Sequence, residues 1–163
     1  MARVAIVMGS DHDLPVVEKA ISCLKDLKVE YEVRVISAHR SPEACAFFSR
    51  SAEENGFGAI IAAAGKAAHL AGAIAANTVL PVIGIPVKSS TLDGVDALLS
   101  TVQMPSGMPV ATVAIDGAEN AAILAAQILA NGDPELRARL KEKRRKALQA
   151  IEEADKRVNE QFK

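Results

Sequence analysis

The chain has 163 residues, enough for one domain with a sizeable core and too few for two domains of ordinary size. Its 19 basic and 20 acidic side chains give a formal net charge of −1, so no excess of positive charge predicts a nucleic-acid or membrane-surface partner. No apolar run is long enough to span a bilayer and the N-terminus lacks a secretory signal pattern, so we expect a cytoplasmic protein with no membrane contact.

Five short apolar runs predict the strands of a β-sheet, and segments of helical character separate them. The runs are Arg3–Met8, Tyr31–Ile36, Ala59–Ala63, Val82–Ile85 and Val110–Ile115. Their nearly continuous hydrophobicity is typical of strands that are covered on both faces. Alternating strands and helices of this length predict a parallel sheet with right-handed crossover connections. We therefore expect a single α/β domain over residues 1–163, in which residues 131–163 form a helical C-terminal extension.

The first predicted strand is followed by Gly9, Ser10 and a helix start near Asp13 and Pro15. Free N–H groups at a helix start, together with a serine hydroxyl, suit an anion such as a phosphate. In the alternative interpretation, Ser10 and Asp13 are ordinary helix-capping residues. His12 lies between them and is, by itself, equally consistent with an exposed loop residue.

The second predicted strand leads into Ser37, Ala38, His39 and Arg40, and Ser41 marks the next helix start. Arg40 can bind a phosphate or a carboxylate through two parallel hydrogen bonds. His39 can act as general acid or base on a ligand held there, because imidazole readily exchanges a proton near neutral pH. The alternative is a surface histidine beside a solvated arginine.

The third predicted strand leads into Gly65, Ala68, His69 and Leu70. Gly65 and the small residues around it allow a backbone to approach a ligand closely. His69 fits such a site, and it fits equally well as a packed residue of the following helix.

All three histidines of the chain, His12, His39 and His69, lie just after the first three predicted strands. In a parallel α/β sheet the carboxyl ends of the strands form one edge, and ligands bind in the crevice there. The positions of the histidines therefore predict a functional site at that edge.

Two predicted helices, residues 67–76 and 117–130, are apolar on nearly every side and rich in alanine. A helix that is apolar all round must be covered all round, so we expect these helices to form contacts between subunits. The alternative is that elements of the same chain cover them. The last predicted helix, residues 134–158, is charged apart from an apolar stripe that packs either on the sheet or on a neighbour. Cys23 and Cys45 fall inside other predicted helices, where buried free thiols are favoured over a disulfide.

Four motifs, in order along the chain, resemble the PurE family of purine biosynthesis. They are the loop from Gly9 to Asp13, Ser37-Ala38-His39-Arg40, Ala67-Ala68-His69-Leu70, and the run Val-Gln-Met-Pro-Ser-Gly-Met-Pro-Val from Val102 to Val110. The resemblance covers nearly the whole chain and implies a flavodoxin-like three-layer α/β/α fold with a five-stranded parallel sheet. It also implies assembly as a homo-octamer and a reaction without a metal ion or an organic cofactor.

The reaction that this resemblance implies is an isomerisation. A mutase of this kind converts N5-carboxyaminoimidazole ribonucleotide to 4-carboxy-5-aminoimidazole ribonucleotide, a small-molecule substrate and product of de novo purine biosynthesis. One family mechanism releases the N-carboxylate as CO2, which the ring carbon attacks before losing a proton to a base. The resemblance gives His39 the role of catalytic proton shuttle. The implied substrate-binding residues are Ser10, Asp13, Ser37, Ala38, Arg40, Gly65, Ala68, His69 and Leu70.

Arg40 favours the mutase branch of the family, because the branch that carboxylates aminoimidazole ribonucleotide directly with CO2 has lysine after its histidine. That direct carboxylase and a non-catalytic phosphosugar-binding module are the alternatives. Four residues depart from the family pattern: His12 stands in place of serine, Ala63 and Lys66 in place of glycines, and Ala71 in place of proline. Neither His12 nor Lys66 receives a role. Three other classes fit worse. A phosphorelay receiver needs an aspartate after the third strand, a flavodoxin needs aromatic residues, and a dinucleotide enzyme needs its glycine fingerprint.

Overall fold

Successive side chains of strand β1 (Arg3–Met8) point to opposite faces of the sheet, and both faces are buried. The computed structural model describes residues 2–163. In it, Val4, Ile6 and Met8 belong to one hydrophobic cluster, whereas Ala5 and Val7 belong to a second. Because side chains alternate along a strand, an unbroken apolar run is what a strand between two cores requires.

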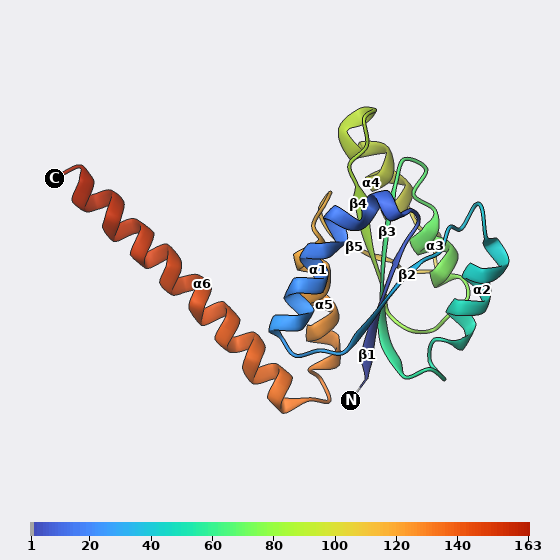
Figure 1. Ribbon diagram of the computed structural model, residues 1–163, viewed down its shortest axis with the longest axis horizontal. Helices are drawn as coiled ribbons and strands as arrows, with labels where there is room; N and C mark the ends of the chain where they lie inside the picture. Colours follow the sequence, from blue (N-terminus) through green and yellow to red (C-terminus); the bar gives the residue numbers. More distant parts are fainter. Residues whose placement is uncertain (1) are drawn as a thin grey trace.

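The sheet contains five strands, all parallel, in the order β2-β1-β3-β4-β5. The other strands are β2 (Tyr31–Val35), β3 (Phe57–Gly65), β4 (Val82–Val87) and β5 (Ala111–Thr112). This is the strand order of the flavodoxin-like fold. Helices cover both faces of the sheet (Figure 1), so the predicted three-layer α/β/α architecture is confirmed.

Strand β5 is much shorter than the run Val110–Ile115 that was predicted. Pro86 in the neighbouring strand β4 explains the difference. Its carbonyl oxygen accepts from the Asp116 N–H, so this residue faces β5, but proline has no N–H to return. The ladder between the two strands therefore stops after Ala111 and Thr112.

Helices α1 (Leu14–Asp26) and α5 (Ala118–Leu129) cover one face of the sheet, and α2 (Pro42–Ser51) and α3 (Leu70–Ala75) cover the other. Helix α3 is shorter than the predicted helix over residues 67–76.

The sequence did not predict α4 (Val95–Val102), which packs closely on β4. A Cβ atom at Gly84 would lie 2.4 Å from Cγ2 of Thr101, so only glycine allows this approach.

The alanine-rich face of α5 is covered inside the single chain. Its members have no exposed surface and pack against α1 and the sheet: Ala118, Ala121, Ala122, Ala125 and Ala126. The chain itself therefore covers this face of α5, whereas Ile123, Leu124 and Ile128 on the same helix stay partly exposed. Cys23 and Cys45 are buried free thiols as expected, and burial raises the pKa of both.

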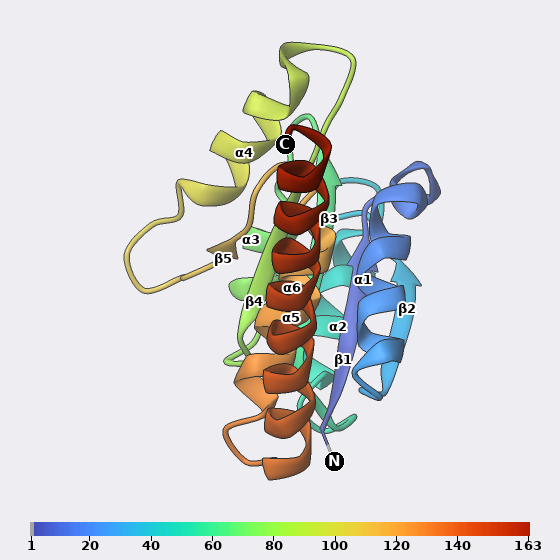
Figure 2. The same cartoon turned by 90° about the vertical axis from the view of Figure 1, so that its left-hand side faces the viewer.

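Helix α6 (Pro134–Gln161) contacts the body only near its beginning and then projects away from it (Figures 1 and 2). Leu136 is buried, Arg139 Nε donates to the Leu27 carbonyl at 2.7 Å, and Lys143 pairs with Glu119 at 2.9 Å. Beyond these contacts the stripe is exposed, with Ile151 at 70%. Within residues 2–163, no helix combines the length and the apolar character needed to cross a membrane.

Candidate active site

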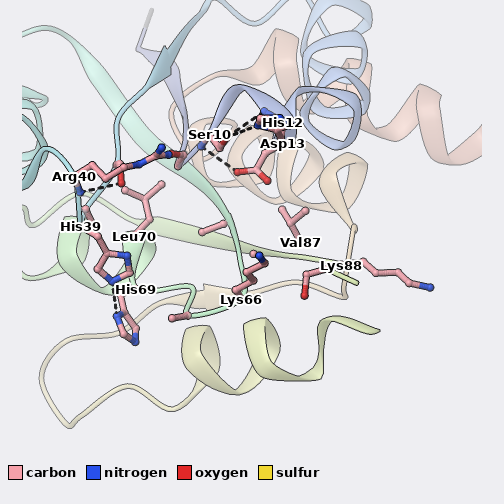
Figure 3. Close-up of a pocket in the computed structure, with 17 residues that line it drawn as sticks. Ser10, His12, Asp13, His39, Arg40, Lys66, His69, Leu70, Val87 and Lys88 are labelled. Atoms are coloured by element: carbon pink, nitrogen blue, oxygen red, sulfur yellow. Dashed lines mark hydrogen bonds between the residues drawn. The ribbon is translucent and has the colours of Figure 1, made fainter. Parts of the chain in front are cut away.

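The loops that follow strands β1 to β4 surround one pocket at the carboxyl edge of the sheet (Figure 3). In the order β2-β1-β3-β4-β5 the strands are added in opposite directions on either side of the boundary between β1 and β3. Ligands bind at such a switch point in open α/β sheets. The lining residues come from four loops: Gly9, Ser10, His12, Asp13, Ser37, Ala38, His39, Arg40, Ala64, Gly65, Lys66, Ala67, His69, Leu70, Val87, Lys88 and Ser89.

The loop after β1 is closed by its own side chains. Ser10 caps a short 3₁₀ turn (Asp11–Asp13): its hydroxyl accepts from the His12 N–H, while the Asp13 carboxylate accepts from the Ser10 N–H at 3.3 Å. Asp13 was expected to cap α1, but it makes no such bond because its carboxylate is turned back to Ser10. Burial raises the pKa of Asp13, and the hydrogen bond from Ser10 partly offsets this effect.

The loop after β2 is held by two serines. The Ser41 hydroxyl donates to the Ser37 carbonyl at 2.9 Å and accepts from the Ser37 N–H at 3.1 Å, so it does not cap α2 as expected. The Ser37 hydroxyl accepts from the Arg40 N–H at 3.1 Å, which leaves its own proton free to donate to a ligand. Arg40 also reaches the Gly9 carbonyl at 3.2 Å, joining the first two loops.

The side chains of His39 and His69 are joined by a hydrogen bond in the pocket lining, although 30 positions separate the two residues in the chain. The distance from His39 Nε2 to His69 Nδ1 is 2.8 Å, and the rings stand nearly perpendicular at 79°. A hydrogen bond between two imidazole nitrogens requires one to carry a proton and the other to lack it. The two rings therefore share one proton, and their tautomers decide which ring donates it.

The loop after β3 brings backbone and small side chains into the pocket. A Cβ atom at Gly65 would lie 3.2 Å from the Val87 carbonyl oxygen of β4, so glycine permits this close pairing. Lys66 follows with a left-handed φ of 56°. Leu70 lines the pocket and is largely buried, and Ala68 is 1% exposed.

Fixed positive charges outnumber negative ones around the pocket. Arg40, Lys66 and Lys88 line it, against the single carboxylate of Asp13. Lys88 is engaged with Asp93 at 3.1 Å. Such a site suits a ligand with more than one anionic group. Within residues 2–163, no three histidine, cysteine or acidic side chains gather closely enough to bind a metal ion.

Every predicted site residue except Ala68 lines this pocket; Ala68 is buried and is not among the lining residues. The sequence interpretation missed Val87, the last residue of β4, and Lys88 and Ser89, which follow it. A signal was present, because a fourth parallel strand must end at the same edge and is followed by the polar run Lys88-Ser89.

A family model described as AIR carboxylase matches residues 3–150 of the chain. The N5-carboxyaminoimidazole ribonucleotide mutase of Pyrococcus abyssi is 57% identical over 144 residues, which are 88% of this chain and 83% of that protein. The mutase of the same name from Escherichia coli K12 is 56% identical over 146 residues, 88% of this chain and 86% of that one.

Two further matches extend the comparison. A phosphoribosylaminoimidazole carboxylase of Ogataea methanolica is 57% identical over 131 residues, which are 80% of this chain but 24% of that protein. The crystal structure of Treponema denticola PurE has a TM-score of 0.87 at 31% identity and covers 97% of this chain and 99% of that one.

Proposed function

Since the chain belongs to the AIR carboxylase family, we propose that it is an isomerase of de novo purine biosynthesis. It converts N5-carboxyaminoimidazole ribonucleotide to 4-carboxy-5-aminoimidazole ribonucleotide. The observation that carries this assignment is the position of His39, an acid–base group beside Arg40 in a pocket with an excess of positive charge. A phosphorylated and carboxylated substrate supplies the matching negative charges.

His39 is the residue that we assign to proton transfer. The bond between the exocyclic nitrogen and the carboxyl carbon breaks, its electron pair stays on nitrogen, and CO2 is released into the pocket. The ring carbon then attacks CO2 and becomes tetrahedral, and loss of its proton restores the aromatic ring while the nitrogen gains one. A base is needed at the ring carbon, and the bond from His39 to His69 gives it a partner that keeps its ring oriented.

The other predicted site residues are proposed to hold the ribonucleotide. Ser10, Asp13 and Arg40 lie on the two loops that contact each other, and we assign phosphate and ribose to them. Ser37 offers a hydroxyl proton, and Gly65 and Leu70 form a close wall that keeps water from CO2. Ala38 and His69 complete the lining, whereas Ala68 is buried in the same loop as His69.

The decisive experiment supplies purified protein with each ribonucleotide while ultraviolet absorbance is followed. We expect rapid conversion of N5-carboxyaminoimidazole ribonucleotide at low bicarbonate, and slow carboxylation of aminoimidazole ribonucleotide by CO2. The physical reason is Arg40, whose planar guanidinium grips an anion in a fixed orientation. Efficient carboxylation at modest bicarbonate, without turnover of the N-carboxylated substrate, would instead assign the second candidate, direct carboxylase activity, which the similarity to the Ogataea protein favours.

We further propose that the enzyme works in the cytoplasm as a homo-octamer, without a nucleic-acid partner. Large apolar side chains support an assembly, because Val79 is 88% exposed, Phe47 70% and Leu92 66% in the single chain. Analytical ultracentrifugation at micromolar protein concentration is expected to show one species of about eight times the chain mass. A well-folded monomer under those conditions would contradict this proposal.

A further inference from the structure

Lys66 occupies a backbone position that glycine adopts more easily. Its φ of 56° lies in the left-handed region, where a Cβ atom is unfavourable. The residue sits in the loop between β3 and α3, directly after Gly65, and its side chain is exposed. A lysine held in this conformation at the pocket edge brings a charge that glycine lacks.

The ammonium group of Lys66 points into the open part of the pocket. Figure 3 shows it between the His39–His69 pair on one side and the Ser10–Asp13 loop on the other. None of the ion pairs found within residues 2–163 includes Lys66, whereas Lys88 on the far side is paired with Asp93. The ammonium group of Lys66 is therefore available to an anionic group of a ligand in the pocket.

The position of Lys66 indicates which anionic group of the ligand it contacts. It shares its loop with His69, which bonds to His39 at 2.8 Å. His39 must lie beside the ring carbon that receives the carboxylate, so the same loop faces that end of the ligand. The proposed function assigns the phosphate to Arg40 and to the loop after β1, which contact each other. We propose that Lys66 binds the transferred carboxylate and sets the preference of the pocket for carboxylated over uncarboxylated ribonucleotides, an inference that rests on the proposed function.

The test measures dissociation constants by titration calorimetry for 4-carboxy-5-aminoimidazole ribonucleotide and for aminoimidazole ribonucleotide. Lys66→Gly is expected to weaken binding of the carboxylated ligand about tenfold, the order expected for one charge-assisted contact, and to change binding of the uncarboxylated ligand less than twofold. Lys66→Arg, which keeps the charge, is expected to restore most of the preference.

Lys28→Gly is the matched control. Lys28 is also an exposed lysine at a left-handed φ, 55°, but it lies after α1 and outside the pocket. Both glycine variants remove one positive charge and relieve the same backbone conformation, so their thermal midpoints should shift alike. Lys28→Gly should leave both dissociation constants unchanged.

Two results would overturn the assignment of Lys66. One is an unchanged affinity of Lys66→Gly for the carboxylated ligand. The other is an equal loss for both ribonucleotides together with weaker binding of inorganic phosphate, which would place Lys66 at the phosphate. Because binding is measured directly, absence of turnover in the wild-type protein would contradict the proposed function separately, without deciding the role of Lys66.

Discussion

Replacing His39 with asparagine is expected to lower kcat by about two to four orders of magnitude while leaving the fold intact, because the proton at the ring carbon then lacks its base. His39 is exposed in a loop, and its side-chain hydrogen bond within residues 2–163 is the one to His69. An asparagine amide can keep a hydrogen bond to His69, but it cannot accept and release a proton near neutral pH.

The measurement is kcat for N5-carboxyaminoimidazole ribonucleotide, with circular dichroism and sedimentation as controls for folding and assembly. His69→Asn is the comparison variant, and it should lose less activity because His39 keeps its place beside the substrate. A His39→Asn protein with a near-native rate would remove His39 from the proton-transfer step. A larger loss in His69→Asn would move the acid–base role to His69.

Replacing Ala122 with glutamate is expected to prevent stable folding. Ala122 has no exposed surface and lies in the cluster between α1, α5 and the sheet. An unpaired buried charge costs about 3–5 kcal/mol or more, which is comparable with the whole stability of a domain, about 5–15 kcal/mol. Urea unfolding monitored by circular dichroism should show a greatly lowered midpoint or no folded baseline.

Asn120→Glu is the control for this substitution, because it adds the same charge to the same helix at an exposed position. Its unfolding midpoint should stay close to that of the wild type. If Ala122→Glu instead gave a folded monomer of normal stability, Ala122 would have to lie at a subunit contact, contrary to its burial within the chain.

Local patterns of the sequence predicted the features that depend on local chemistry. The apolar run Arg3–Met8 forms a strand with the predicted bounds. The dipeptide Asp133-Pro134 predicted the start of α6, and there the Asp133 carboxylate accepts a hydrogen bond from the Leu136 N–H. The loops after the first three strands could also be placed at one edge, because parallel strands end on the same side.

Features set by contacts between distant residues could not be predicted in this way. The short β5 depends on Pro86 in a neighbouring strand, and the burial of the α5 alanines depends on α1. The bond between His39 and His69 joins two loops whose spacing no single-sequence pattern encodes. Asp13 turned back to Ser10 because a 3₁₀ turn precedes α1, and the sequence does not distinguish that turn from a simple helix start.

The two-sided burial of the central strands has a consequence for how this protein can change over evolutionary time. Ile6 and Val7 face opposite hydrophobic cores, so the side chains on both faces of β1 are committed to packing and none can serve as a reactive group. Reactive groups are confined to loops whose residues contribute little to either core. Natural variation at a rim position such as Lys66 can therefore alter ligand preference while the packing stays as it is, and descendants of one scaffold can diverge in substrate without having to refold.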